Sequence, residues 1–257
     1  MWDARVPLHV DSRFYDVAGF VAGRSALRDF EREELGSVAG LDVAHLQCHF
    51  GLDTLSLARL GARVTGLDFS EPAIEAARQI AVDCGLDAEF VAADVYDAVA
   101  ALDHRTFDLV YTGLGALCWI PDLVGWARVV DELLRPGGTL YLAEFHPLHQ
   151  MTADDDLTLT HGYFGEADGL RWDDDFTYTE HASLGASYES WEWTHPLSAV
   201  ITSLLDRGLV LESFHEHPFT LWQRWPFLER HDDGTWHMPA DRPSLPLVYS
   251  LRARKPA

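Results

Sequence analysis

The sequence has little lysine and no long apolar run, and both shortages narrow the classes of protein to which it can belong. Lys255 is its only lysine, and its 19 basic residues stand against 41 acidic ones, which gives a formal net charge of -22. A surface this acidic repels phosphate backbones and anionic membranes, so we expect neither nucleic acid nor a membrane as a partner. No apolar run approaches the ~20 residues that a membrane helix needs.

Cysteine is also scarce. The three cysteines, Cys48, Cys84 and Cys118, are odd in number and have no framework spacing, which is typical of a reducing compartment. The first ten residues, MWDARVPLHV, lack the basic and apolar regions of a signal peptide. These features predict a cytoplasmic protein. The 257 residues suffice for a single domain over 1–257, which we expect to be a monomer or homodimer with a small-molecule substrate.

Strand-like and helix-like segments alternate through the first half of the chain. Strands are predicted over 41–48, 62–69, 88–95, 107–114 and 139–146, and helices over 51–61, 71–85 and 121–134. Ser70 and Gly85 are the expected ends of the second helix, and the RPGG run at 135–138 is expected to end the third. This alternation predicts an α/β fold with a parallel sheet, whose ligands lie beyond the carboxyl ends of the strands.

The remaining segments flank this core, which we place at 41–147. Residues 1–40 are expected to form an N-terminal helical cap. Residues 148–194 are acidic and aromatic, and the stretches 157–164 and 175–193 predict a small antiparallel insertion that serves as a lid, with solvated loops at the Asp triplets 154–156 and 173–175. In the last region, 195–257, a helix over 195–208 precedes two strands within 209–219 and 245–255, which are expected to pair antiparallel.

Two acids stand where strands of the predicted sheet end. Asp68 follows Gly51 by 17 residues, and its carboxylate can accept hydrogen bonds from both hydroxyls of a ribose. The Asp94 carboxylate can accept a hydrogen bond from the amino group of an adenine. The alternatives are a helix-start acid for Asp68 and a turn residue for Asp94. Phe69 can lie against the adenine or in the core.

The segment HLQCHFGLDT, residues 45–54, occupies the place of a cofactor loop but contains one glycine, Gly51. Gly51 opens a helix whose backbone N–H groups would face an anion. A phosphate needs several glycines for close backbone approach, whereas a carboxylate is smaller and needs fewer. The loop therefore favours a nucleoside that carries an amino acid over a dinucleotide, and it opposes a nicotinamide dehydrogenase.

Five segments in this order resemble the motifs of class I S-adenosylmethionine (SAM)-dependent methyltransferases: HLQCHFG, TGLDFS, AADV, FDLVYTGLGAL and LLRPGGTLYLAEFHP. The resemblance implies a Rossmann-like seven-stranded sheet, mostly parallel with a C-terminal antiparallel pair. It implies SAM as cofactor and S-adenosylhomocysteine (SAH) as product. The binding residues that it implies are Asp68 for the ribose, Asp94 and the Val95 backbone for the adenine, and Gln47, His49, Gly51, Thr112, Gly113 and Tyr15 around the methionine part.

The first motif departs from the family pattern. His45 takes the place of the usual acid, and Gln47 and His49 take the places of two glycines. We expect Gln47 and His49 to offer side-chain donors to the SAM carboxylate. An alternative is a catalytically inactive protein that binds SAM or another ligand on the same fold.

Methyl transfer depends mainly on holding the acceptor in line with the methyl group, and a base is needed only for an acceptor that carries a proton of high pKa. His146, beyond the fifth strand, is the leading candidate for this base, and Glu144 is expected to steady a substrate amine. The alternative for His146 is a strand-end residue hydrogen-bonded to a loop. Lower-ranked histidines are His9, His195, His215 and His217.

No metal is expected, because thirteen histidines make the His215 and His217 pair a chance occurrence. Aromatic residues of the lid suit an aromatic or heterocyclic substrate, or a cation held over a ring face. The alternative is that they form the small core of the insertion itself. The sequence therefore predicts an enzyme that methylates O, N or C of a small aromatic or heterocyclic molecule, with specialised metabolism as its setting.

Overall fold

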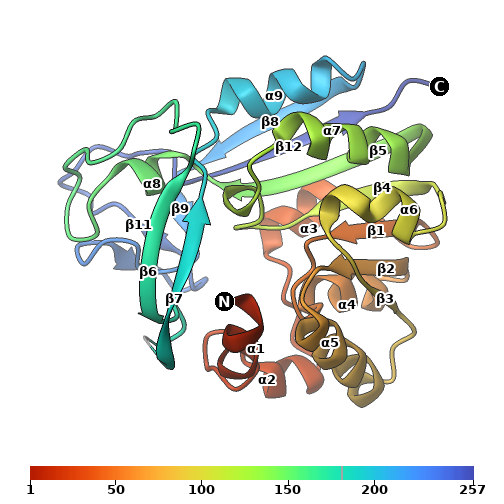
Figure 1. The fold of residues 1–257 in the computed structure, drawn as a ribbon, viewed down its shortest axis with the longest axis horizontal. Helices are drawn as coiled ribbons and strands as arrows, with labels where there is room; N and C mark the ends of the chain where they lie inside the picture. The colour runs from red at the N-terminus through yellow and green to blue at the C-terminus, as the bar shows by residue number, and fades with distance from the viewer. Residues whose placement is uncertain (181) are drawn as a thin grey trace.

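A seven-stranded sheet forms the centre of the computed structural model, which describes residues 1–180 and 182–257 (Figure 1). The strand order is β3-β2-β1-β4-β5-β12-β8. The strands are β1 Asp42–Leu46, β2 Arg63–Asp68, β3 Glu89–Ala92, β4 Phe107–Thr112, β5 Leu134–Phe145, β8 Val210–His217 and β12 Val248–Arg254. β12 is antiparallel to β5 and β8, and the other neighbours are parallel. The α/β fold and the final antiparallel pair are confirmed.

Helices cover both faces of this sheet. On one face lie α3 Asp29–Leu35, α4 Leu52–Arg59 and α5 Glu71–Cys84, and on the other lie α6 Ala98–Ala101, α7 Leu123–Leu133 and α9 Leu197–Leu205 (Figure 1). Because both faces are covered, the central strands are almost continuously buried. Among the described residues, no helix is long and apolar enough to cross a membrane.

The helix ends follow the sequence signals with one difference. Ser70 caps α5 by accepting the Ala73 N–H, and Gly85 ends it in a left-handed conformation. The RPGG run at 135–138 was expected to separate a helix from a strand, but β5 already begins at Leu134, directly after α7. The run joins the sheet because Gly137 and Gly138 exchange backbone hydrogen bonds with Lys255, at the end of the neighbouring β12.

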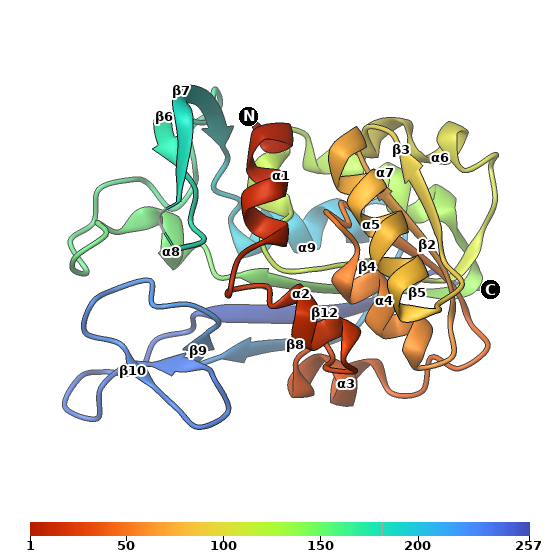
Figure 2. The same ribbon diagram turned by 90° about the horizontal axis from the view of Figure 1, so that it is seen from below.

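The N-terminal segment contains α1 Trp2–Val10, α2 Val17–Val21 and α3. Figures 1 and 2 show α1 between α5 and the hairpin of β6 Leu170–Phe176 and β7 Ser183–Glu192. The N-terminal segment therefore borders the carboxyl edge of the sheet.

The insertion contains α8 Leu148–Met151 and the antiparallel β6–β7 hairpin. The interpretation of 157–164 as a strand was wrong, because these residues, all described, form a single bridge between Leu159 and Thr152. The triplet 173–175 lies in β6 and not in a loop, since a hairpin with one face in water tolerates acids. The predicted stretch 175–193 includes residue 181, which lies outside the described residues.

A second small sheet follows β8. Its strands are β9 Phe219–Thr220, β10 Glu229–Arg230 and β11 Trp236–His237, and Trp225 is the centre of a separate apolar cluster beside it. Figure 2 shows this sheet and the β6–β7 hairpin at the same end of the molecule, away from the C-terminus. Two short 3-10 helices, η1 Val95–Asp97 and η2 Leu117–Trp119, follow β3 and β4.

Candidate functional site

A cavity of about 1520 Å³ lies beyond the carboxyl ends of the parallel strands, where the sequence predicted a ligand. Its volume exceeds the roughly 300–1,000 Å³ of an ordinary ligand pocket, so it has room for two molecules. The walls combine the strand ends with the aromatic side chains of the insertion and of the loop after β9. The sequence-predicted residues that line it are Tyr15, Gln47, His49, Gly51, Asp68, Phe69, Asp94, Val95, Gly113, Glu144 and His146.

The loop between β1 and α4 follows a left-handed backbone path at three alternate residues. The φ angles are 57° at Gln47, 51° at His49 and 78° at Gly51. Such angles favour glycine, yet the first two positions carry large side chains. A Cβ at position 51 would lie 2.6 Å from Cε1 of Phe90, so only Gly51 is fixed by both conformation and space. The loop therefore keeps the conformation of a glycine-rich loop with one glycine.

The Gln47 side chain turns toward the loop after β4. Its Nε2 donates to the Ala116 carbonyl at 2.8 Å, and its Oε1 is buried with no partner among the described residues. Buried polar atoms are almost always hydrogen-bonded in proteins. The geometry therefore favours Gln47 as an acceptor in the cavity, in place of the donor that we expected.

His49 connects the cofactor loop with the N-terminal helix. Its backbone N–H donates to Asp68 at 2.8 Å, and its Nε2 lies 2.9 Å from Nδ1 of His9. Nε2 of His9 lies 2.6 Å from Oγ1 of Thr177 in the hairpin segment. Burial lowers the pKa of both histidines, which stay neutral near pH 7. The His49 ring thus bonds to His9, whereas the sequence had suggested a ligand carboxylate.

Asp68 and Asp94 lie in the cavity wall at the ends of β2 and β3. Asp68 is buried and accepts from the backbone N–H groups of His49 and Ser70, at 2.8 and 3.0 Å. Burial raises the pKa of Asp68, while these two hydrogen bonds oppose the rise. Asp94 accepts the Tyr96 N–H at 2.9 Å, as a turn residue does. Each carboxylate oxygen has two lone pairs, so both side chains keep capacity for ligand hydroxyl or amino groups.

The other predicted cofactor residues occupy different parts of the site. Phe69 is 56% exposed at the cavity, so the core alternative for it is wrong. Val95 and Gly113 line the cavity, whereas Thr112 is fully buried behind the wall. Tyr15 lines the cavity from the N-terminal segment and its hydroxyl bonds to that of Tyr178.

Glu144 does not have the free carboxylate that the sequence suggested. Its Oε1 accepts from the N–H groups of Gly115 and Phe145, and its Oε2 accepts from those of Ala116 and Leu117, all between 2.6 and 2.9 Å. Four backbone donors occupy both oxygens. Glu144 therefore shapes the loop after β4, because it accepts the N–H groups of three consecutive residues of that loop.

His146 has the role that we gave as the alternative. Nδ1 accepts the Leu148 N–H at 3.2 Å, which leaves the ring proton on Nε2, and Nε2 faces Oε1 of Glu216 at 3.3 Å. Burial lowers the pKa of His146. Both ring nitrogens have partners within the protein, so the geometry favours this alternative over the role of a base.

Among the lower-ranked histidines, Nε2 of His195 lies 2.9 Å from the carbonyl oxygen of Ile120. Nδ1 of His215 lies 2.8 Å from Glu34, and Nε2 of His217 lies 3.1 Å from Ser250. Within 1–180 and 182–257, no group of three or more His, Cys, Asp or Glu side chains is arranged to hold a metal ion.

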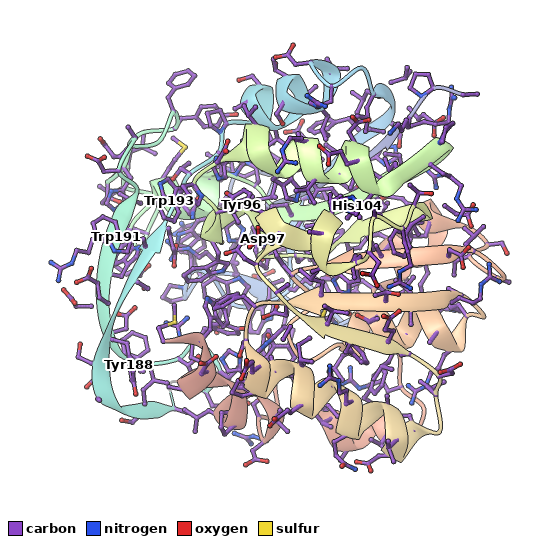
Figure 3. The ribbon with its side chains drawn as sticks, turned by 45° about the vertical axis from the view of Figure 1, so that its right-hand side comes forward. Tyr96, Asp97, His104, Tyr188, Trp191 and Trp193 are labelled. Carbon is purple, nitrogen blue, oxygen red and sulfur yellow. The ribbon has the colours of Figure 1, made fainter. Side chains whose placement is uncertain are left out.

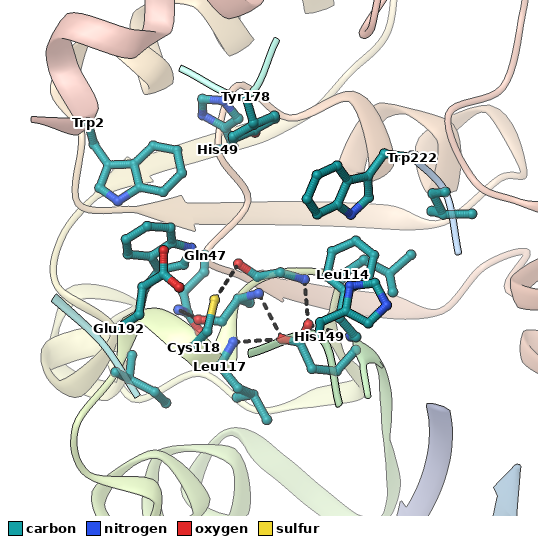
Figure 4. A pocket seen from close by; sticks show the side chains of 18 of the residues that line it. Trp2, Gln47, His49, Leu114, Leu117, Cys118, His149, Tyr178, Glu192 and Trp222 are labelled. Carbon is teal, nitrogen blue, oxygen red and sulfur yellow. Dashed lines mark hydrogen bonds between the residues drawn. The ribbon is translucent and has the colours of Figure 1, made fainter. Parts of the chain in front are cut away.

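Several cavity residues were not found from the sequence. His149 is buried, and its Nε2 has no partner in the described part of the chain. Figure 4 shows His149 near Trp222 toward one end of the cavity, and Trp2 and Glu192 toward the other. Arg5 also lines the cavity. No motif marks these residues, because they come together only through folding of the insertion and the N-terminal helix.

Two carboxyl groups, one buried and one half-buried, border the place where the family has its first acid. His45 itself is buried, and its Nδ1 lies 2.7 Å from Thr54 Oγ1. Asp53 and Glu31 line the same part of the cavity, and burial raises the pKa of both. Glu31 accepts the Tyr111 hydroxyl proton at 2.6 Å. Residues outside the motif thus bring two carboxyl groups to this part of the cavity, and the raised pKa of each favours its protonated form.

Comparisons with known proteins agree with this geometry. The sequence model of a family described as a methyltransferase domain matches residues 44–140. Over these residues the chain is similar to methyltransferase domains. The matched residues contain β2 to β4 and most of β1 and β5, with Asp68, Asp94 and the 47–51 loop.

Two curated relatives share this domain. A ubiquinone biosynthesis O-methyltransferase from Methylobacterium sp. (strain 4-46) is 33% identical over 144 residues, which are 55% of this chain and 57% of the relative. One from Xanthomonas euvesicatoria pv. vesicatoria (strain 85-10) is 32% identical over 135 residues, which are 51% of this chain and 56% of the relative. The chain therefore spans little more than half the length of the curated relatives that it matches.

Solved methyltransferases share the fold more widely. A SAM-dependent methyltransferase from Mesorhizobium loti has a TM-score of 0.57 and 20% identity, over 91% of this chain and 99% of that one. Another from Clostridium acetobutylicum ATCC 824 has a TM-score of 0.59 and 15% identity, over 100% and 96%. At sequence identities this low, the similarity to these structures shows a shared fold and nothing more.

Proposed function

We propose that this chain is a SAM-dependent methyltransferase that methylates O, N or C of a small aromatic or heterocyclic molecule. The observation that carries the proposal is the single cavity. It joins strand ends bearing Asp68 and Asp94 with a wall of aromatic side chains, and its volume suits two molecules. The domain match supports the same reaction class.

The residues at the strand ends fit SAM group by group. Asp68 has lone pairs for the ribose hydroxyls, and Asp94, Val95 and the exposed ring of Phe69 line the same cavity and suit an adenine. The Oε1 of Gln47, which has no partner among the described residues, and the half-buried carboxyl of Asp53 suit an ammonium group. This assignment gives the methionine ammonium acceptors that the motif acid, replaced by His45, does not supply.

Bound SAM would supply an electrophilic methyl group, and the chain's own residues would place an acceptor against it. The aromatic walls would hold a flat acceptor and exclude water. Burial lowers the pKa of His149 to about 3, so its ring stays neutral, and its buried, unpartnered Nε2 can accept a hydrogen bond from an acceptor hydroxyl. His149 replaces His146 in this proposal as the group that orients the acceptor proton.

The curated relatives are named for O-methylation in ubiquinone biosynthesis. Phenols are therefore the first acceptor class to test, followed by heteroaromatic amines. Transfer of labelled methyl from SAM to any member of such a panel would support the proposal. Binding of SAM without transfer to any acceptor would favour the inactive ligand-binding alternative.

Calorimetry with SAM and SAH tests the cofactor half directly. The variant Asp94→Ala removes the proposed adenine acceptor and is expected to weaken SAH binding by roughly 10- to 100-fold, as one hydrogen bond to a charged group is worth ~1.5–3 kcal/mol. Asp97→Ala is the matched control, because Asp97 is exposed and is not among the residues that line the cavity. Figure 3 shows Asp97 next to Tyr96. Absence of SAM and SAH binding to the wild-type chain would contradict the proposal.

A further inference from the structure

Arg5 is a buried cation without a hydrogen-bond partner. It lies on α1 in the cavity wall and is 5% exposed. A guanidinium carries five N–H donors. Arg5 makes no hydrogen bond and no ion pair with any described residue, and its Nε is fully buried. Buried charges in proteins are otherwise paired or hydrogen-bonded, so this arrangement requires an explanation.

Two indole rings hold the Arg5 guanidinium in place. Its Cζ lies 5.3 Å from the ring centroid of Trp2 and 5.9 Å from that of Trp119. Such cation–π contacts orient the group but accept none of its N–H donors. Burial lowers the pKa of Arg5, which is the mark of a charge that has lost water. The donors are therefore positioned at the cavity without an acceptor.

The carboxylates nearest to Arg5 do not pair with it. Glu192 and Asp174 are close enough to act on Arg5 through space, yet neither forms an ion pair with it. Glu192 accepts instead from Gln150 Nε2, at 3.4 Å. Arg224, in the same cavity, shows the contrast: it pairs with Asp154 at 2.8 Å and donates to backbone carbonyls. Arg5 thus differs from the structural arginine of this cavity.

We propose that Arg5 binds the carboxylate group of a ligand in the cavity, and that this ligand is the methyl acceptor, an aromatic acid. The planar fork of a guanidinium matches a carboxylate with two parallel hydrogen bonds. Arg5 contacts Trp2 and Trp119, so it belongs to the aromatic part of the cavity wall, which we propose holds the acceptor. The substrate class rests on the proposed function, whereas carboxylate binding by Arg5 does not. The methionine end of SAM carries the same group, so the test separates the two sources.

The test uses the full chain saturated with SAH and a panel of aryl carboxylates, each paired with its uncharged amide, such as indole-3-acetate and indole-3-acetamide. Wild-type protein is expected to prefer the acids by roughly 10-fold or more, and Arg5→Met is expected to abolish this preference. Arg5→Lys keeps the charge without the fork and is expected to be intermediate. Arg13→Met is the matched control, since Arg13 is an exposed arginine of the same N-terminal segment.

The source of the carboxylate is identified by comparing wild type and Arg5→Met in their binding of SAH. The same comparison with 5′-deoxy-5′-methylthioadenosine, which lacks the amino-acid part, is the control for a cofactor without a carboxylate. If Arg5→Met weakens SAH binding alone, the carboxylate is that of the cofactor. If SAH binds equally and the acid preference is lost, the carboxylate is that of the acceptor. Equal binding of acids, amides and SAH by wild type and Arg5→Met would overturn the inference while leaving the methyltransferase proposal intact.

Thermal unfolding without ligand separates a binding role from a structural one. Met is shorter than Arg, but it is unbranched and apolar, so it can pack against the indoles without a charge to desolvate. We therefore expect Arg5→Met to melt at the same temperature as wild type or higher, as is common when a binding residue is removed. A clear decrease in melting temperature would mean that Arg5 stabilises the fold, and would count against the inference.

Discussion

At the scale of single residues, the cofactor loop shows that backbone conformation can be kept when glycines are not. Gln47 and His49 hold left-handed φ angles at a cost of about 1 kcal/mol each. Their side chains form hydrogen bonds with Ala116 and His9 that a glycine could not make. These contacts offset the strain. They explain why the loop can lack two of the usual glycines and still keep the same backbone conformation.

Gly51→Ala should destabilise the protein more than Gly85→Ala does. Both glycines have positive φ, 78° and 62°, so each substitution carries about 1–2 kcal/mol of backbone strain. At position 51 the new Cβ would also lie 2.6 Å from Phe90, which adds about 1–3 kcal/mol of overpacking, whereas nothing lies within 4 Å at position 85. Urea unfolding of the two variants measures the difference, and equal losses would contradict the packing argument.

His45 should make stability depend on pH. Burial lowers its pKa to about 3 in the folded chain, against about 6.5 in the unfolded chain. Between these values the unfolded chain binds an extra proton, so the free energy of unfolding falls as the pH drops from 6.5 toward 3. His45→Asn should reduce that slope by up to ~1.4 kcal/mol per pH unit. Parallel curves for wild type and variant, from urea unfolding between pH 4 and 7, would refute the burial argument.

The sequence could indicate Asp68 and Asp94 because their position depends on strand order alone. It could not give the true environments of Glu144 and His146, because their partners come from the loop after β4 and from Glu216 on β8. Arg5 could not be found for the same reason, since its position depends on contacts with Trp119, far along the chain.

At the scale of elements, hydrogen bonds join three segments that are distant in sequence. The Asp68 carboxylate bonds to His49, His49 to His9 on α1, and His9 to Thr177 after β6. Occupation of the cofactor loop can therefore influence how firmly α1 and the hairpin are held over the cavity.

Thr177→Val should loosen this connection without disturbing the sheet. The substitution keeps the side-chain volume and removes the hydroxyl that lies 2.6 Å from His9. Hydrogen exchange in α1 and in the β6–β7 hairpin should accelerate roughly 5-fold, as expected for about 1 kcal/mol, while β1 and β4 remain protected. Thr160→Val is the control, because Thr160 is exposed. Unchanged exchange in both elements would show that the His9 contact does not hold them.

Elements with strong periodicity and clear ends, such as α5, were predictable from the sequence. In the insertion β7 lies within the predicted stretch 175–193, but β6 was missed, because Asp173 and Asp174 have low strand propensity and are held in the strand by pairing with β7. The alternating strands and helices of the core could be recognised, because each of them has its own hydrophobic pattern and end residues in the sequence. The insertion depends on contacts with α1 and with the region after β8, which no local pattern contains.

At the scale of the whole molecule, the negative charge should favour SAM over SAH. The chain carries a net charge of -22, and the cavity wall includes Asp53, Asp68 and Asp94. SAM has one more positive charge than SAH, at the sulfonium, so the field of the protein attracts the substrate form of the cofactor more than the product form.

Salt should reduce this advantage. The Debye length shortens from about 10 Å at 0.1 M to about 3 Å at 1 M, which screens exposed acids such as Asp94 more than buried ones. The ratio of the Kd of SAH to that of SAM should therefore fall as salt is raised, while 5′-deoxy-5′-methylthioadenosine, which is neutral, serves as the control for general salt effects. Calorimetry at both salt concentrations measures the ratio. A ratio independent of salt would mean that the sulfonium is recognised only by buried groups at short range, and that the overall acidity of the protein does not act on the cofactor.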